Sequence, residues 1–333
     1  MKKSAIRYAP MRVQARPGSA VEKQYYLKSG LPSGWSVPTA IAPGIDPSPF
    51  DDLIYHGGKV VSQMEFQNVY LSGARPWRER DVSSIDRAIR LAMQAPRLNN
   101  VIAQYFPGAS LSCDVRESLL WEGPAPTRLD EPDVQKTVIR LYDEGKILKS
   151  DLGSCIFNLI LPPGSELRLG SSSSFRGLGG YHGSVHISRA GKKITLYYSA
   201  NVFSEIQASG RENGIAVFDR PWKNVVATLY HELNEFRTDA DVNDAIQNDE
   251  DGFLGWNSRR GSEIGDQPIF ASGANLNLVF KEVSGRVGGP RLPIQLMYSN
   301  AAHGAEGPIA TPYAPAITAV KKKSKPKRAA RAA

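Results

Sequence analysis

The residues best suited to chemistry lie in one short segment, Tyr230-His231-Glu232-Leu233-Asn234-Glu235. It reads H-E-x-x-E, one residue away from the H-E-x-x-H helix of zinc hydrolases, and in a helix His231 and Glu235 would share a face. In that helix, ligands one turn apart face one ion, while the intervening glutamate polarises an attacking water. A carboxylate is an acceptable zinc ligand, and a site richer in oxygen also admits calcium, manganese or iron.

The same residues have a plainer interpretation, as the solvated or salt-bridged face of an ordinary helix. Two other segments favour a site. Upstream, residues 179–184 place the phenol of Tyr181 and the imidazole of His182 on glycine-rich backbone, although a packed loop would account for them as well. Downstream, an acidic stretch that ends with Glu263 and Asp266 could fold back over the end of the helix.

A well-marked helix should position the H-E-x-x-E segment. Asp219 can cap its first turn, and Pro221 fits the position where a missing N–H costs nothing. The helix is expected to run to about Arg237, with a buried apolar stripe on one side and His231 and Glu235 on another. The stripe consists of Val225, Val226, Leu229, Leu233 and Phe236.

The remaining elements predict an α+β fold, a single large domain whose mixed β-sheet is packed by helices. One helix is expected after a cap at residues 83–84, ending at Pro96, and another over residues 133–145. The Ser- and Gly-rich segment 171–183 is expected to be a loop. Strands are expected over 60–70, 155–161, 185–187 and 194–202, the last two forming a hairpin around Ala190-Gly191-Lys192.

Composition divides the chain into four parts. Residues 1–48 are expected to form an extended or disordered lead-in, 49–300 the globular domain, 301–320 a linker, and 321–333 a basic disordered tail. The tail holds seven Lys and Arg and no acid, so it supplies seven of the eight net positive charges. This charge fits a solubilising role, contact with nucleic acid or other acidic surfaces, or an address read by a receptor.

Several protein classes are disfavoured by what the sequence lacks. Cys113 and Cys155 are the only cysteines, too few for a disulfide scaffold. No apolar run is long enough for a secretory signal or for the roughly twenty residues of a membrane span. We therefore expect a cytoplasmic protein without a membrane span.

A second type of cation site is weakly suggested by the acidic stretch after the helix. Its residues match positions 1, 3, 5 and 12 of a calcium-binding loop, but Asp244 stands where that loop demands glycine. The alternative is an acidic surface loop. The matching residues are Asp239, Asp241, Asn243 and Glu250.

Five short motifs follow one another along the chain. They are Tyr55-His56-Gly57-Gly58, Leu161-Pro162-Pro163-Gly164, Gly180-Tyr181-His182, His231-Glu232-Leu233-x-Glu235-x-x-Thr238-Asp239, and Gly255-Trp256 with Glu263-Ile264-Gly265-Asp266. In this order, over roughly residues 54–270, the chain resembles the Exordium, or phosphate-induced, protein family and its bacterial relatives. The resemblance implies a zincin-like metal helix, with His231 and Glu235 as ligands, Glu263 or Asp266 as further acidic ligands, and Glu232 as general base.

The resemblance also bears on where the protein acts. Plant members of the family are cell-surface proteins linked to growth and carbon-status signalling. This chain has Ser174 and Gln267 near positions where cysteines are expected in the family, which fits a reducing compartment.

Two functions follow from these residues. The first is a metal-dependent hydrolase of peptide or amide bonds, with zinc as the expected divalent metal and calcium as the alternative. In it Glu232 accepts the proton of water and passes it to the leaving amine, while Tyr181 or His182 hydrogen-bonds the developing oxyanion. The second is a non-catalytic binding or signalling module with a structural metal or acidic cluster. A protein that acts chiefly through its basic tail is a third interpretation.

Overall fold

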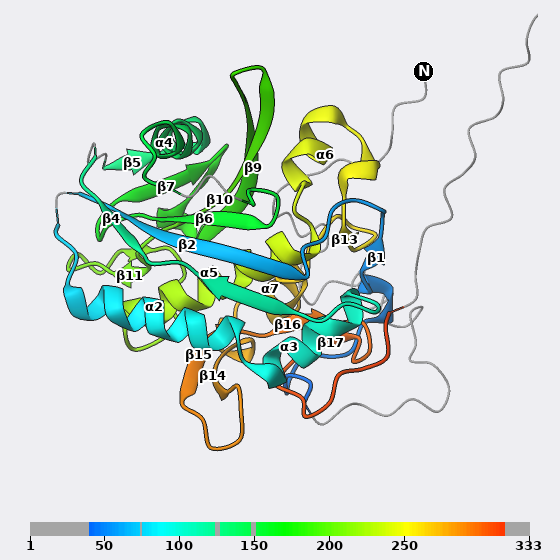
Figure 1. Ribbon diagram of the computed structural model, residues 1–333. Coiled ribbons are helices and arrows are strands. Elements are labelled where there is room, and N and C mark those ends of the chain that lie inside the picture. The colour runs from blue at the N-terminus through cyan, green and yellow to red at the C-terminus, as the bar shows by residue number, and fades with distance from the viewer. Residues whose placement is uncertain (1–39, 74, 124–126, 148–150, 317–333) are drawn as a thin grey trace, which may run out of the picture.

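The computed structural model describes residues 40–73, 75–123, 127–147 and 151–316, drawn in colour in Figure 1. The basic tail 321–333 and most of the expected lead-in lie outside these residues. The described chain has the predicted α+β fold, in which a mixed sheet is covered by helices on both faces (Figure 1). None of its described helices is both long and apolar enough to cross a membrane.

The central sheet has six strands in the order β3-β2-β6-β10-β9, with β4 also paired to β2. All run parallel except β9, which is antiparallel and forms one edge. β6 lies at the middle and is buried along its whole length, as its nearly continuous apolar sequence predicts. The strands are β2 (Gln63–Leu71), β3 (Ser112–Val115), β4 (Leu119–Trp121), β6 (Cys155–Ile160), β9 (Gly180–Arg189) and β10 (Lys192–Asn201).

The predicted hairpin of β9 and β10 is confirmed, and its turn type is now defined. Ala190 and Gly191 both have positive φ, 49° and 75°, as the two central residues of a type I′ turn require. β9 begins earlier than expected, however, so Tyr181 and His182 lie in a strand and not in a loop. Glycine suits this part of the strand because a Cβ on Gly183 would lie 2.4 Å from Asn243 Nδ2.

Helices cover both faces of the sheet (Figure 1). α4 (Glu131–Asp143) packs on one face and α2 (Glu79–Met93) with α5 (Pro221–Thr238) on the other, giving two separate core clusters. α4 starts with a capping box between Asp130 and Asp133. The predicted cap of α2 at residues 83–84 is wrong, because both serines lie inside the helix, and Pro96 begins the next helix, α3 (Pro96–Ile102).

α5 carries the H-E-x-x-E segment and is buried from Asn224 to Thr238 on every side. The hairpin of β14 (Phe280–Ser284) and β15 (Arg291–Gln295) covers the side that the sheet leaves open. The predicted apolar stripe is buried as expected. Asp219 does not cap the helix; its carboxylate instead accepts a hydrogen bond from Lys223 Nζ at 2.8 Å.

The acidic stretch after α5 does not form a calcium loop. Asn243 and Asp244 lie in a helix, α6 (Val242–Asn248), beside the edge strand β9. The buried carboxylate of Asp239 accepts hydrogen bonds from the Gly255 N–H at 2.8 Å and from Asn257 Nδ2 at 2.9 Å. The expected match to a calcium loop is therefore wrong, because a helix replaces the loop and Asp239 already has protein partners.

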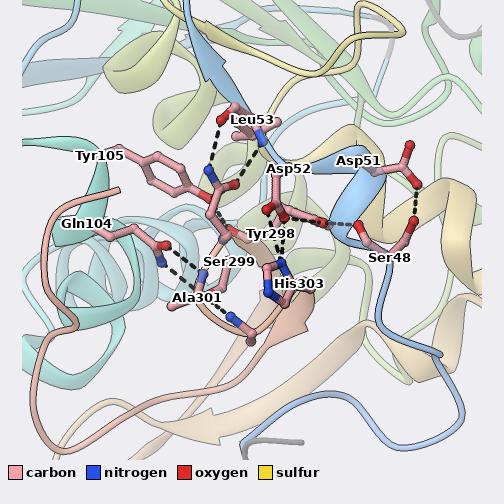
Figure 2. Close-up of polar contacts among 12 residues, drawn as sticks. Ser48, Asp51, Asp52, Leu53, Gln104, Tyr105, Tyr298, Ser299, Ala301 and His303 are labelled. Carbon is pink, nitrogen blue, oxygen red and sulfur yellow. Dashed lines mark hydrogen bonds and ion pairs between the residues drawn. The ribbon is translucent and has the colours of Figure 1, made fainter. Parts of the chain in front are cut away.

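The two ends of the described chain meet, as the contacts in Figure 2 show. His303 Nδ1 lies 2.9 Å from Asp52 Oδ1, and the Tyr298 hydroxyl donates to the Ser48 carbonyl at 2.7 Å. Residues 40–48 and 301–306, expected as lead-in and linker, thus belong to the folded body, where Ile41 bridges to Glu306.

Short strands complete the described chain. They are β1 (Ile54–Tyr55), β5 (Arg128–Leu129), β7 (Glu166–Leu169), β8 (Ser172–Ser173), β11 (Glu205–Ile206), β12 (Glu212–Asn213), β13 (Trp256–Asn257), β16 (Met297–Ser299) and β17 (Gly304–Glu306). β16 holds a loop of the candidate site in place, because the Tyr298 N–H donates to the Ile264 carbonyl at 2.9 Å.

Candidate metal centre

Three parts of the fold deliver acids and imidazoles to one cavity of about 130 Å³. We call it the acidic cavity. Its imidazole and carboxylate side chains are His182 from β9, His231, Glu232 and Glu235 from α5, and Glu263 and Asp266 from the segment that leads into α7 (Asp266–Ser272).

The α5 residues of the cavity are not a solvated helix face. His231 is 7% exposed and Glu232 and Glu235 are each 3% exposed, so the interpretation as an ordinary surface helix is wrong. Among the described residues that line the cavity, Arg260 is the only lysine or arginine, and its Nε lies 3.5 Å from Asp51. A group of buried carboxylates with so little positive charge around it requires protons or cations.

The orientation of His231 is fixed by a chain of hydrogen bonds. The Gly265 carbonyl can only accept, so it defines the amide nitrogen of Gln295, which donates to it at 2.5 Å. The Gln295 oxygen then faces His231 Nδ1 at 2.8 Å, which assigns the proton to that nitrogen. The other ring nitrogen, Nε2, faces Glu235 Oε1 at 3.0 Å and is the one whose lone pair would bind a cation when the ring is neutral. This is how ligating histidines are usually held.

Gly265 also supports His231 sterically. A Cβ at position 265 would lie 2.5 Å from Nδ1 of the His231 ring. The backbone of Gly265 is in the ordinary helical region, so the need for glycine here is one of space and not of conformation.

His182 is oriented in a similar way from the opposite side. Its Nε2 lies 3.2 Å from the Asp239 carbonyl, which can only accept, so Nε2 carries the proton. Nδ1 faces two carboxylates of α5, with Glu232 Oε2 at 3.5 Å and Glu235 Oε2 at 3.6 Å. In both imidazoles, the nitrogen that faces Glu235 is the one that would bind a cation when the ring is neutral.

Three carboxylate oxygens in the cavity are buried without a hydrogen bond in the described structure: Glu232 Oε2, Glu235 Oε1 and Glu263 Oε1. Buried carboxylate oxygens normally have partners. Here the side chains form two groups with the spacing of metal ligands, His182 with Glu232 and Glu235, and His231 with Glu235 and Asp266. These buried His and Glu groups could hold a metal ion.

Charge and burial shift the titration of these groups. Burial would lower the pKa of His231, yet the charges of Glu235 and Glu232 outweigh it and raise the pKa to about 10. Burial would raise the pKa of Glu235, but the facing imidazoles lower it to about 2. For Asp266, burial and then the charge of Glu235 raise the pKa to about 7. Without a cation, the cavity balances its charge by holding protons.

No family model, no curated protein and no solved structure matches this chain. The chemistry of the acidic cavity therefore has to be inferred from its own residues.

The structure brings some of the sequence-predicted site residues into one ligand group and leaves others outside it. His231, Glu235 and Asp266 form one of the two groups, whereas Glu263 belongs to neither and lies 3.6 Å from His182 Nε2, behind that ring. Tyr181 lines the cavity but packs edge-to-face on Tyr198 in the core cluster under α4, and its hydroxyl has no hydrogen bond in the described structure.

The sequence gives no signal for one residue that matters to the site, Gln295, and suggests a different role for another, Asp239. Gln295 lies at the end of a short strand almost 60 residues after α5, and only its complete burial and its contact with His231 mark it. Asp239 was noticed as part of an acidic stretch, but its carbonyl, and not its carboxylate, faces His182.

Proposed function

We propose that this protein is a metal-dependent hydrolase of peptide or amide bonds, with zinc as its metal. The observation that carries the proposal is the burial of the H-E-x-x-E segment. One oxygen of Glu232 and one of Glu235 have no hydrogen bond in the described structure, and each lies beside an imidazole, 3.5 Å from His182 Nδ1 and 3.0 Å from His231 Nε2. A structural acidic cluster would instead pair each oxygen with a protein donor, as Asp239 does.

The residues that would hold the ion are His231, Glu235 and Asp266. Zinc is bound by histidine nitrogen and by Asp and Glu oxygen, and its catalytic sites combine three protein ligands with a further position for water. A divalent cation held there would supply Lewis acidity, lowering the pKa of a bound water and polarising a substrate carbonyl.

Glu232 is the general base of the proposal. It follows His231 on α5, and its Oε2 points into the cavity without a hydrogen bond. Burial raises the pKa of Glu232, which suits a carboxylate that accepts a proton from water and returns it to a leaving amine. His182 Nδ1 lies 3.5 Å from this carboxylate.

The proposed substrate class follows from the rest of the lining. Apolar side chains from four different segments surround the acidic groups, as expected where an apolar residue beside the scissile bond is bound. They are Leu169, Leu178, Val242, Ile246, Leu254 and Phe270.

The resemblance to the Exordium family supports the proposal without deciding it. The motifs that carry the resemblance include His182, the segment from His231 to Asp239, and the segment from Glu263 to Asp266. All three contribute to the acidic cavity or to the contacts behind it. We propose that the chain is a relative of that family.

The test is Glu232→Gln in the full-length protein, with a quenched-fluorescence library of unstructured peptides as substrate. Glutamine cannot accept the proton, so hydrolysis should fall by about 10²- to 10⁴-fold, while an ion stays bound by His231, Glu235 and Asp266. Glu250→Gln, on an exposed glutamate beyond α6, is the matched control and should leave the rate unchanged. A wild-type protein that holds its ion and cleaves none of the library would overturn the hydrolase and leave a binding module.

A further inference from the structure

Glu235 presents its two oxygens to two different imidazoles. Oε1 lies 3.0 Å from His231 Nε2, and Oε2 lies 3.6 Å from His182 Nδ1. A carboxylate that serves one ion directs one or both oxygens to a single point. Glu235 is the only residue common to the two ligand groups of the described structure, and each of its oxygens lies near the imidazole of a different group.

The second group is as complete as the first. His182 is 7% exposed, and its Nδ1 faces Glu232 Oε2 and Glu235 Oε2. Its ring is held from behind by the Asp239 carbonyl, as His231 is held by Gln295. Glu232 is 3% exposed, and its Oε2 has no hydrogen bond in the described structure and lies 3.5 Å from the same nitrogen of His182.

Charge balance favours two cations over one. The four carboxylates that line the cavity carry four negative charges when ionised, and ligating imidazoles are neutral. The one arginine of the described lining already faces Asp51. One divalent cation would leave two negative charges uncompensated in a largely buried site, whereas two would balance it. The carboxylates are Glu232, Glu235, Glu263 and Asp266.

We infer that the acidic cavity holds two divalent cations bridged by the carboxylate of Glu235. One is bound by His231 and Asp266, and the other by His182 and Glu232. This inference rests on the proposed metal-dependent function and deepens it. Two adjacent cations can stabilise both the attacking and the leaving atoms of a hydrolysis. Glu232 would bind the second cation through Oε2 and keep its other oxygen for the proton.

The experiment measures how many zinc ions each chain binds. Full-length protein is stripped with a chelator, dialysed against Zn²⁺, and analysed for bound zinc per chain. Wild-type protein should hold two ions, and His182→Ala and Asp266→Asn one each. His186→Ala is the matched control and should hold two, because this histidine of the same strand is half exposed and faces Asp244 on α6.

The possible results distinguish the pair of cations from the proposed hydrolase activity. One zinc per wild-type chain, or two retained by His182→Ala, would overturn the pair of cations and leave the hydrolase intact. No zinc at all would overturn both. A second measurement avoids any folding defect of the variants, because wild-type protein loaded with Mn²⁺ should give the electron paramagnetic resonance spectrum of an exchange-coupled pair. The six-line spectrum of isolated Mn²⁺ at full loading would contradict the bridge.

Discussion

Gln295 is the residue on which the orientation of His231 depends. It accepts from Nδ1 through one end of its amide and is itself fixed through the other by the Gly265 carbonyl. Gln295→Leu keeps the size of the side chain but removes both contacts, leaving the ring free to turn and its tautomer free to change. We expect zinc affinity to fall by about 10- to 100-fold, the usual effect of losing such a contact, measured by competition with a chelating dye.

The matched control for that change is Gln135→Leu. Gln135 lies on α4 and donates to the Tyr198 hydroxyl, and it belongs to neither ligand group of the described structure. Zinc affinity should be unchanged in this variant. Equal affinities for Gln295→Leu and wild type would show that packing alone orients His231.

The pH dependence of metal binding follows from the protonation of the His231 imidazole. In the cation-free protein the pKa of His231 is raised to about 10, so its ring carries a proton at neutral pH. A cation requires the neutral ring and must displace that proton. Affinity should therefore rise with pH, by about tenfold per unit for each proton displaced, up to the pKa of the ring. Calorimetric titrations at one pH in two buffers of different ionisation enthalpy measure the release. Identical heats would contradict it.

At this scale the sequence predicted the residues on α5 well and their surroundings poorly. His231, Glu232 and Glu235 follow from the spacing of one helical turn, which is local. The environment of His182 does not, because it depends on where β9 begins, and glycine-rich residues concealed a strand. Gln295 could not be found at all, since a contact across 64 positions leaves no trace in local pattern.

At the scale of elements, the entry of α5 is held by an asparagine and not by the predicted cap. Asn224 Oδ1 accepts from the Val217 and Phe218 N–H groups, and its Nδ2 donates to the Ser204 carbonyl. The side chain is 2% exposed, so removing it leaves buried backbone groups unpaired. We expect Asn224→Ala to lower the free energy of unfolding by about 2 to 4 kcal/mol, measured with urea.

Asp219→Ala is the control for this prediction, because sequence pattern alone assigns the cap to Asp219. Its carboxylate pairs with Lys223 on the exposed surface, where such a contact contributes little. The unfolding curve of this variant should overlay that of wild type. A larger loss for Asp219→Ala than for Asn224→Ala would reverse the assignment.

Elements with strong local signals were predicted and those set by distant contacts were not. The hairpin turn at Ala190-Gly191 and the buried strand β6 carry their own signals, the glycine in the first and nearly continuous apolar residues in the second. The break at Pro96 was misread because proline fits the first turn of a new helix as well as it ends an old one. Only the packing of α3 against its neighbours distinguishes a proline that begins a helix from one that ends a helix.

At the scale of the whole molecule, the limits of the folded body were the part of the fold furthest from sequence prediction. Residues 40–48 and 301–316 are rich in Pro, Gly and Ala and were expected to be connecting segments. Contacts with distant parts of the chain hold them in place: the Ala42 N–H donates to the Ala305 carbonyl at 2.8 Å, and the Ala316 N–H donates to the Gln104 carbonyl at 2.9 Å. The composition of a segment predicts whether it folds on its own, but not whether contacts with a distant segment hold it in the folded body.

This closure also supports the acidic cavity. Asn300 accepts from the Leu53 N–H and donates to the Leu53 carbonyl, both at 2.8 Å. It follows β16 directly, and the backbone of β16 holds Ile264 between Glu263 and Gly265. Loss of the Asn300 contacts should therefore loosen both the chain ends and the segment that carries Asp266.

Asn300→Ala tests this coupling. Removing the amide leaves both backbone groups of Leu53 without their partner in a buried position, so the free energy of unfolding should fall by about 2 to 4 kcal/mol. Zinc affinity should fall with it, since a looser 263–266 segment weakens the position of Asp266. Asn275→Ala, at an exposed asparagine, is the control and should change neither quantity. Reduced stability with unchanged zinc affinity would show that the closure of the chain ends and the acidic cavity are independent.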